Sequence, residues 1–460
     1  MPITSFLQIP QTSHYWLRNG QVPLSLLVDG SSRQPLMAKF PHSHDRSALV
    51  SVDVEVCDGR VVSLRSPSTA LEGADIEEDV PTIDVKSGMI WPCFVDMHTH
   101  LDKGHIWPRS PNPDGTFHQA LETVRRDSQQ RWNAEDVYRR ADFGLRCSYA
   151  HGSQAIRTHL DAFDEQGEIS FGVFRKLRQA WANRIQLQAV CLVTLDYFLT
   201  PKGEKLADLV ADCGGVLGGV AFMNPEIVQQ IDRVFELAKE RELDLDFHTD
   251  ESLNPDDTAL RLVAEAAIRH GFAGRITCGH CCSLSVQSNQ EIEQTIMAVK
   301  AAGISIVSLP MCNLYLQDRP QGQNSRRTPR YRGVTLLEEL KAAGVKCAIA
   351  SDNCRDPFHA YGDHDGLEVF TQSVKIGQLD HPIADWARAI TQIPAEMMGL
   401  DGVGRIVEGA AADFVVFKAR SFNELMARGQ GDRVVIRNGK QIDTALPDYA
   451  ELDALMDSVS

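Results

Sequence analysis

The stretch MIWPCFVDMHTH, residues 89–100, is an apolar run that ends in two histidines separated by one residue. Short runs of the same kind, rich in β-branched residues and bounded by Gly, Pro or Asp, recur along the chain after it. Together with 89–98, these runs occupy residues 153–161, 185–193, 215–222, 243–251, 275–282, 304–310 and 345–353. The pattern predicts eight β-strands.

The segments between these runs have helical periodicity, as in PEIVQQIDRVFELAKERE and NQEIEQTIMAVKAAG, and several end on Gly, a common stop signal. Parallel strands need helical crossovers, and eight strand–helix units close a barrel. We therefore predict an α/β fold in which residues 89–399 form a (β/α)₈ TIM-like barrel. A doubly wound sheet is the alternative, but it needs a Gly-rich phosphate loop after the first strand, where this chain has HTHLD.

The two flanks of the predicted barrel have a different pattern. Residues 49–64 alternate in polarity around the Asp-Gly pair of VCDGR, which is a strong hairpin signal, and GRIVEGAAADFVVFKA contains further strand patterns. We expect residues 1–88 and 400–445 to fold together as a small β-sandwich domain formed by both chain ends. Residues 446–460 are expected to be a C-terminal tail.

Composition excludes several classes of protein. The 460 residues are 43% hydrophobic and 23% charged, which is ordinary for a globular protein and excludes disorder and coiled coil. A formal net charge of −16 with no basic stripe disfavours nucleic acid as a partner. No stretch approaches the roughly 20 apolar residues that span a bilayer, and the eleven cysteines are scattered through apolar runs, which favours a reducing compartment. We expect a cytoplasmic homo-oligomer that binds neither nucleic acid nor membrane.

Chemically active side chains gather at the predicted strand ends. His98 and His100 are two residues apart, so both point to one side at the carboxyl end of the first strand, where barrel active sites lie. Later strands end near His248, His280 and Asp352. Neutral imidazoles and a carboxylate suit Zn²⁺ or Fe²⁺ with one position left for water. We predict that the metal ligands are His98, His100, His248 and Asp352.

The predicted site holds one divalent ion. Two-metal barrel hydrolases need a bridging ligand, often at the end of the fourth strand, and GVLGGVAFMN has no ionisable side chain before Glu226.

Several motifs together resemble a known family. They are HTHLD at 98–102, RTHLD at 157–161, FHTDE at 247–251, GH at 279–280, NLYLQDR at 313–319, TPRYRGVT at 328–335 and ASDNCRDPF at 350–358. In order and spacing they resemble the amidohydrolase superfamily, specifically its cytosine deaminase-like branch. The resemblance covers nearly the whole predicted barrel and extends weakly to GRIVEGAAADFVVF.

The resemblance implies hydrolytic deamination of an aminated nitrogen heterocycle, cytosine or a related base, in which C–NH₂ becomes C=O and ammonia leaves. It implies the same four metal ligands. It makes Glu251 the proton carrier that protonates the ring nitrogen beside the reacting carbon. His280 orients the water or stabilises its addition product, and Asp352 accepts or holds a proton.

The expected substrate contacts depart from the cytosine-acting members of that branch. Those members carry a glutamine at the end of the third strand, where this chain has Thr194, and Asn353 follows the metal carboxylate. A short hydroxyl leaves room that a long amide fills, so we predict a ring as large as cytosine or larger. The predicted substrate-binding residues are Thr194, Asn353, Phe358, Trp107 and His159, with the loop 317–332 as a further wall.

Two alternatives remain at this stage. An amidohydrolase with this site could instead remove an N-alkylamino group from a triazine or open a cyclic amide. A catalytically silent barrel that only binds a small molecule is the non-enzyme alternative. Release of ammonia from cytosine would distinguish the first prediction from both.

Overall fold

The structure, a computed structural model, describes residues 6–27, 49–67, 80–320 and 327–456. The chain divides into two compact units. The first comprises Met1–Val95, Ser148–Gln154 and Asp365–Leu446, and the second comprises Asp96–Cys147, Ala155–His364 and Pro447–Ser460.

The second unit is built on parallel strands, as predicted for an α/β barrel. They are β6 (Phe94–Thr99), β7 (Ser153–Asp161), β8 (Gln186–Leu192), β9 (Leu217–Ala221), β10 (Leu245–Thr249), β11 (Ile276–His280), β12 (Ser305–Ser308) and β13 (Cys347–Ile349). Strands β6 to β8 form one ladder and β9 to β13 another. Bridges between Val190 and Val216 and between Thr99 and Asp352 connect the two ladders at both junctions. Backbone pairing therefore runs round all the strands in chain order, which confirms the predicted TIM-like (β/α)₈ arrangement.

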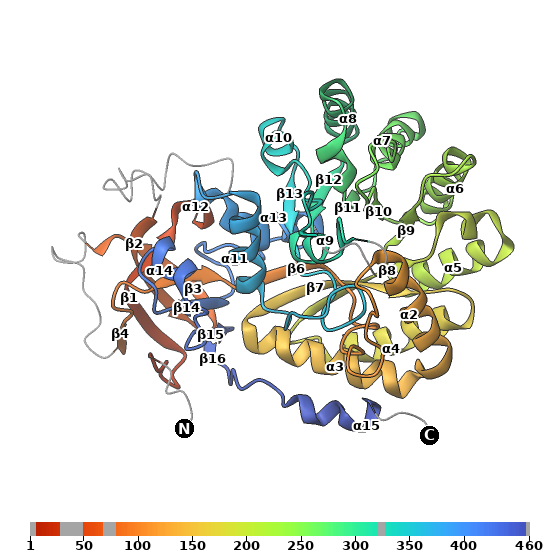
Figure 1. The fold of residues 1–460 in the computed structure, drawn as a ribbon. Helices are drawn as coiled ribbons and strands as arrows, with labels where there is room; N and C mark the ends of the chain where they lie inside the picture. Colours follow the sequence, from red (N-terminus) through yellow and green to blue (C-terminus); the bar gives the residue numbers. More distant parts are fainter. Residues whose placement is uncertain (1–5, 28–48, 68–79, 321–326, 457–460) are drawn as a thin grey trace. The chain divides into compact units, whose positions relative to one another are not determined.

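Helices follow most of these strands, and Figure 1 shows α5 to α8 in an arc beside β9 to β12. The longer helices are α2 (Phe117–Arg131), α3 (Ala134–His151), α4 (Glu165–Trp181), α5 (Pro201–Asp212), α6 (Ile227–Glu240), α7 (Ala259–His270) and α8 (Asn289–Ala302). Shorter ones are η3 (Leu195–Leu199), η4 (Cys282–Val286), α9 (Pro310–Leu316), α10 (Leu337–Ala342), η6 (Tyr449–Leu452) and α15 (Asp453–Met456). Local sequence sets the limits of α8, because Ser288 and Glu291 form a capping box and Gly303 ends the helix at φ 68°.

The apolar run that begins at residue 89 forms two strands instead of the single strand predicted. Its first part is β5 (Met89–Pro92), which pairs antiparallel with residues 414–417 in the first unit, and its second part is β6. Proline has no N–H to donate to a ladder, so regular pairing ends at Pro92. One run thus supplies strands to two sheets.

Within its described residues, the first unit contains one sheet with eight strands. In addition to β5, they are β1 (His14–Pro23), β2 (Leu49–Cys57), β3 (Arg60–Arg65), β4 (Thr82–Asp84), β14 (Phe414–Phe417), β15 (Val434–Arg437) and β16 (Lys440–Gln441). The predicted hairpin is β2–β3, with Asp58 at φ 48° and Gly59 at φ 76° as its turn. Where the sequence suggested a β-sandwich, the described strands lie on one continuous path, β16-β15-β14-β5-β1-β2-β3, with β4 beside β1.

The first unit also contains helices from residues that the sequence analysis assigned to the barrel, 89–399. These are α11 (Gly366–Gly377), α12 (Ile383–Trp386), η5 (Ala387–Ile390) and α13 (Gln392–Met397), beside η1 (Leu24–Leu26) and α14 (Phe422–Ala427). Asp365, which caps α11, accepts two hydrogen bonds from the Arg433 guanidinium at 2.6 and 2.7 Å. This bidentate pair fixes the start of α11 to the segment before β15, so the boundary of the unit lies at Asp365 rather than near residue 400.

The thiols are almost all inside the protein. Ten of the eleven cysteines are buried, Cys57 is half-buried, and all eleven are free. Within the described ranges, no helix has both the length and the apolar composition to cross a bilayer.

Candidate active site

The structure brings the four predicted metal ligands together at the carboxyl ends of the strands. His98 lies near the end of β6 and His100 directly follows this strand, with their Nε2 atoms 3.7 and 3.2 Å from Oδ1 of Asp352. Nε2 of His248, on β10, lies 3.5 Å from Nε2 of His100. All four side chains are buried.

Two residues at the strand ends have an unusual backbone conformation that orients their side chains. Asp352 and His280 have φ values of 62° and 67°, in the left-handed region that side chains other than Gly seldom adopt. Asp352 is held there because its N–H donates to the carbonyl of His98 at 2.8 Å, and Thr99 Oγ1 donates to the Asp352 carbonyl at 2.8 Å. Such conformations cost about 1–3 kcal/mol each and persist mainly at functional sites.

The polar atoms of this cluster fit a divalent cation. Both ring nitrogens of His98, Nδ1 of His100 and of His248, and both carboxylate oxygens of Asp352 have no hydrogen-bond partner within the described part of the chain. Buried polar atoms without partners are costly, and their convergence is typical of a metal site. Burial lowers the pKa of His98, His100 and His248 well below the usual value, so these imidazoles are neutral and can ligate a metal.

His159, predicted to contact substrate, lies inside the histidine cluster. Its ring centroid is 3.9 Å from that of His98, and it groups with His98 and His248 at ligand spacing. Arg157, on the same strand, donates to Asp246 at 2.8 Å, and Nε2 of His159 is 4.0 Å from the same carboxylate. His159 is fully buried. It therefore packs against the neighbouring imidazoles inside the protein.

Glu251 and His280 lie beside the predicted ligand Asp352 and are linked by a residue that the sequence did not identify as part of the site. Nδ2 of Asn313, on α9, is 3.0 Å from Nδ1 of His280 and 3.4 Å from Oε1 of Glu251. Burial lowers the pKa of His280 to about 3. Burial, followed by the charge of Asp352, raises the pKa of Glu251 well above its ordinary value. The available signal for Asn313 was its place at the start of NLYLQDR.

Asp250, the neighbour of Glu251, has a different role. Its carboxylate accepts hydrogen bonds from the N–H groups of Ala259 and Leu260 at 2.7 and 3.0 Å, at the beginning of α7. A carboxylate at a helix N-terminus satisfies free N–H groups and complements the helix dipole. Asp250 therefore stabilises α7.

Lys103 adds a buried positive charge. Its Nζ is 2.8 Å from Oδ1 of Asp161 and 5.3 Å from the ring centroid of Phe358. Burial alone would lower the pKa of Lys103, but the carboxylates of Asp161 and Asp102 raise it to about 12. The ammonium group remains charged, and it lowers the energetic cost of the carboxylates around it.

The remaining predicted substrate residues differ in their surroundings. Both polar ends of Asn353 are engaged, since Nδ2 donates to Asp356 at 2.7 Å and Oδ1 accepts from the Cys312 thiol at 3.6 Å. Phe358 packs against Phe117 with ring centroids 5.6 Å apart. Thr194 follows β8 and bridges to Val220 on β9, and Trp107 is half-buried in the loop after β6. Residues 321–326 of the predicted wall loop lie outside the described residues.

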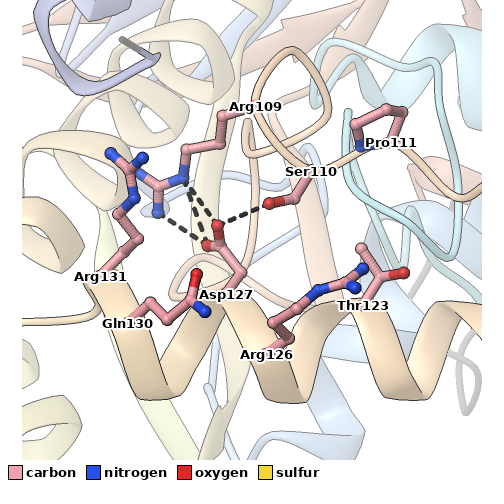
Figure 2. A pocket seen from close by; sticks show the side chains of 8 residues that line it. All are labelled: Arg109, Ser110, Pro111, Thr123, Arg126, Asp127, Gln130 and Arg131. Atoms are coloured by element: carbon pink, nitrogen blue, oxygen red, sulfur yellow. Dashed lines mark hydrogen bonds and ion pairs between the residues drawn. The ribbon is translucent and has the colours of Figure 1, made fainter. Parts of the chain in front are cut away.

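A hollow of about 210 Å³ also lies beside α2. Figure 2 shows its lining, with the Arg109 guanidinium and the Ser110 hydroxyl both directed at Asp127. Arg109 also donates to Asp136 at 2.5 Å, so its charge is balanced by two carboxylates. None of the predicted site residues lines this hollow.

Comparison with known proteins agrees with this geometry. The profile of the Amidohydrolase family matches residues 143–442. A pterin deaminase of Rhizobium rhizogenes (strain K84) is 47% identical over 455 residues, which is 98% of this chain and 99% of that protein. An N-isopropylammelide isopropyl amidohydrolase of Pseudomonas sp. (strain ADP) is 24% identical, covering 85% of this chain and 93% of that protein. The crystal structure of 5-methylcytosine deaminase from Klebsiella pneumoniae, liganded with 5-fluorocytosine, has a TM-score of 0.75 at 23% identity, covering 93% of this chain and 97% of that chain.

Proposed function

The chain belongs to the amidohydrolase family, and from that premise we propose that it is a metal-dependent hydrolase that deaminates a pterin ring. The reaction replaces the 2-amino group with an oxo group by addition of water and releases ammonia. The observation that carries this proposal is the convergence of the strand-end ligands with Glu251 and His280, in a chain that matches a pterin deaminase almost end to end.

We propose that one divalent ion, Zn²⁺ or Fe²⁺, is held by His98, His100, His248 and Asp352. When bound, such an ion lowers the pKa of water enough to supply hydroxide near neutral pH. The buried and unpartnered donor atoms of these four side chains support this set. The ring of His159 packs against the ring of His98.

Proton movement falls to Glu251, His280 and Asp352. The raised pKa of Glu251 favours a carboxyl group that carries a proton, which it gives to the ring nitrogen next to the reacting carbon. That transfer draws electron density from the carbon and makes it a better electrophile. Asp352 accepts the proton of the attacking water and passes it to the amino group, which leaves as ammonia, while the hydroxyl proton of the addition product returns to Glu251.

His280 acts as a hydrogen-bond donor. Its Nδ1 faces the amide N–H of Asn313, so the ring proton lies on Nε2, which has no partner in the described part of the chain. This N–H can stabilise the oxygen that becomes attached to the ring carbon, as donors in an oxyanion hole do.

The substrate pocket is expected to accept a bicyclic ring. Thr194 stands at the end of β8 in place of a longer amide and leaves space there. The Asn353 side chain is engaged by Asp356 and Cys312, so it holds the loop after β13 and leaves Phe358 as an apolar wall. Trp107 forms a second wall of the proposed substrate pocket.

The test is a comparison of substrates with ammonia as the readout. Purified protein is assayed with pterin, cytosine and 5-methylcytosine, and with N-isopropylammelide by release of isopropylamine. We expect pterin to have the highest kcat/KM and its product to be the 2,4-dioxo ring, identified by mass. Absence of ammonia from pterin together with isopropylamine release would overturn the proposal. A Glu251→Gln preparation controls for contaminating activity.

We further propose that the enzyme is a cytoplasmic homo-oligomer. Its free and buried thiols support a reducing compartment. Light scattering of the purified protein tests the oligomeric state, and fractionation of the source cells tests the location.

A further inference from the structure

The second unit contains another cluster of metal-ligating side chains, made of His105, Cys354 and His364. One nitrogen from each histidine and the Cys354 sulfur all lie within 4.8 Å of one another. The three side chains are buried, with 1%, 2% and 3% of their residue surface exposed. His105 lies in the loop after β6, and the other two lie in the loop after β13.

His105 lacks the hydrogen bonds that a buried histidine normally makes. Neither of its ring nitrogens has a partner within the described chain. Its ring lies edge-on to Phe143 at 5.0 Å between centroids, and Tyr449 lies at 6.3 Å. A buried imidazole without partners costs about 1–3 kcal/mol, so such a ring calls for an explanation such as an ion.

The position of His364 depends on a glycine. A Cβ placed on Gly144, in α3, would lie 3.0 Å from Nε2 of His364 and 3.2 Å from Leu101. The absence of a side chain at Gly144 therefore leaves the room in which the His364 ring lies beside α3. His364 itself has φ 54°, a costly conformation for a side chain of this size.

The donor set indicates the class of ligand. A burial this deep excludes a thiol nucleophile that meets a substrate, but it suits a closed metal site. Two imidazoles and a thiolate are typical ligands of Zn²⁺. Tetrahedral ligands at about 2.0–2.3 Å from zinc lie about 3.3–3.8 Å apart, which the observed cluster reaches with small side-chain movements.

We propose that His105, Cys354 and His364 bind a second ion, a structural Zn²⁺, apart from the catalytic metal. On binding, the Cys354 thiol gives its proton to solvent and the sulfur becomes a ligand. The proposal does not rest on the deaminase function, because none of the three residues belongs to the catalytic set.

Such an ion would join the two loops that carry the catalytic ligands. These loops already meet through backbone hydrogen bonds, from the N–H of His105 to the carbonyl of Cys354 at 3.0 Å and from Trp107 to Arg355 at 2.8 Å. His100 lies five residues before His105, and Asp352 two before Cys354. Nearby, Arg140 is neutralised by Asp136 at 2.7 Å, which limits its repulsion of a cation.

Cobalt substitution tests the proposal without an activity assay. Protein stripped with a chelator is reloaded with Co²⁺ alone, and metal content and absorption are measured. We expect two Co²⁺ per chain and a thiolate-to-cobalt charge-transfer band. Cys354→Ser is expected to bind one Co²⁺ and lose the band, while His248→Ala binds one and keeps it. Cys213→Ser, at a buried thiol that follows α5, is the matched control and should keep both ions and the band.

Two outcomes would overturn the proposal. One is a wild-type protein that binds a single Co²⁺ without a thiolate band, and the other is a band that persists in Cys354→Ser. His105→Asn provides an independent variant if Cys354→Ser does not fold, and it must also lose one ion. Failure of the catalytic site is distinguishable, because it would remove the ion that His248 holds and leave the thiolate band.

Discussion

Nδ2 of Asn313 lies 3.0 Å from Nδ1 of His280, and this contact determines which nitrogen of the imidazole carries the proton. An amide N–H can only donate, so Nδ1 accepts and the ring proton is on Nε2. The same amide group reaches Glu251 at 3.4 Å. A residue that need not touch the substrate thereby positions both groups to which we assign proton handling.

Asn313→Asp should lower kcat about 10²-fold at unchanged metal content. A carboxylate at this position accepts a hydrogen bond from Nδ1–H and so favours the tautomer in which Nε2 is an acceptor, which cannot stabilise a developing negative charge. Steady-state ammonia release and metal analysis measure the effect. Asn313→Ser, which keeps a donor, should retain more activity, and equal losses in the two variants would argue against control of the tautomer.

Glu251→Gln should lower kcat by about 10²-fold or more while the protein keeps its metal and its melting temperature. Glutamine preserves the shape of the side chain but has no transferable proton. Kinetics, elemental analysis and calorimetry are the measurements.

Asp250→Asn is the matched control for Glu251→Gln. It removes the charge that caps α7, so it should lower the free energy of unfolding by about 0.5–2 kcal/mol and leave kcat nearly unchanged. If the two variants exchange these effects, Asp250 is the proton carrier.

His248→Ala should remove the catalytic ion and nearly all turnover. The three proposed ligands that remain, His98, His100 and Asp352, leave one further coordination position without a protein ligand. Elemental analysis after dialysis, followed by reloading with excess Zn²⁺, measures this. Arg241→Ala, at the half-buried residue that ends α6 and pairs with Asp208, is a control that should change neither metal content nor turnover. Full occupancy in His248→Ala would show that His159 or another donor replaces it.

Thr194→Gln should lower kcat/KM for pterin more than for cytosine. The longer amide fills the space that a second ring needs, and it adds a donor and an acceptor suited to a pyrimidine edge. Parallel assays of pterin, cytosine and 5-methylcytosine provide the ratio. A variant with an unchanged ratio would show that Thr194 does not contact the substrate.

The strands, and the gathering of the candidate metal ligands at their ends, could be predicted from sequence because their signals are local. Alternating or apolar runs set β7 to β13, and His98, His248 and Asp352 are found directly at or after strand ends. The sequence analysis did not predict the end of β5 at Pro92, and the pairing of β5 with β14 depends on residues more than 300 positions away.

The contacts that complete the site could not be predicted in this way. Asn313 meets His280, and His105 meets Cys354 and His364, only after the strands are arranged side by side. Spacing along the chain has no information on such pairs. The contacts of Asn353 could not be predicted for the same reason. It is next to a predicted ligand in sequence, but its side chain is engaged by Asp356 and Cys312.

The burial of ten cysteines in a chain without disulfides has a practical consequence. A thiol sealed in the interior reacts with an alkylating reagent only when the backbone around it opens, so its labelling rate reports the local opening equilibrium. Cys57 labels from the folded surface, whereas Cys191, on β8, and Cys278, on β11, label only as their own strands open. Mass spectrometry of timed alkylation would therefore rank the strands of the barrel by how often each one opens, without any added probe.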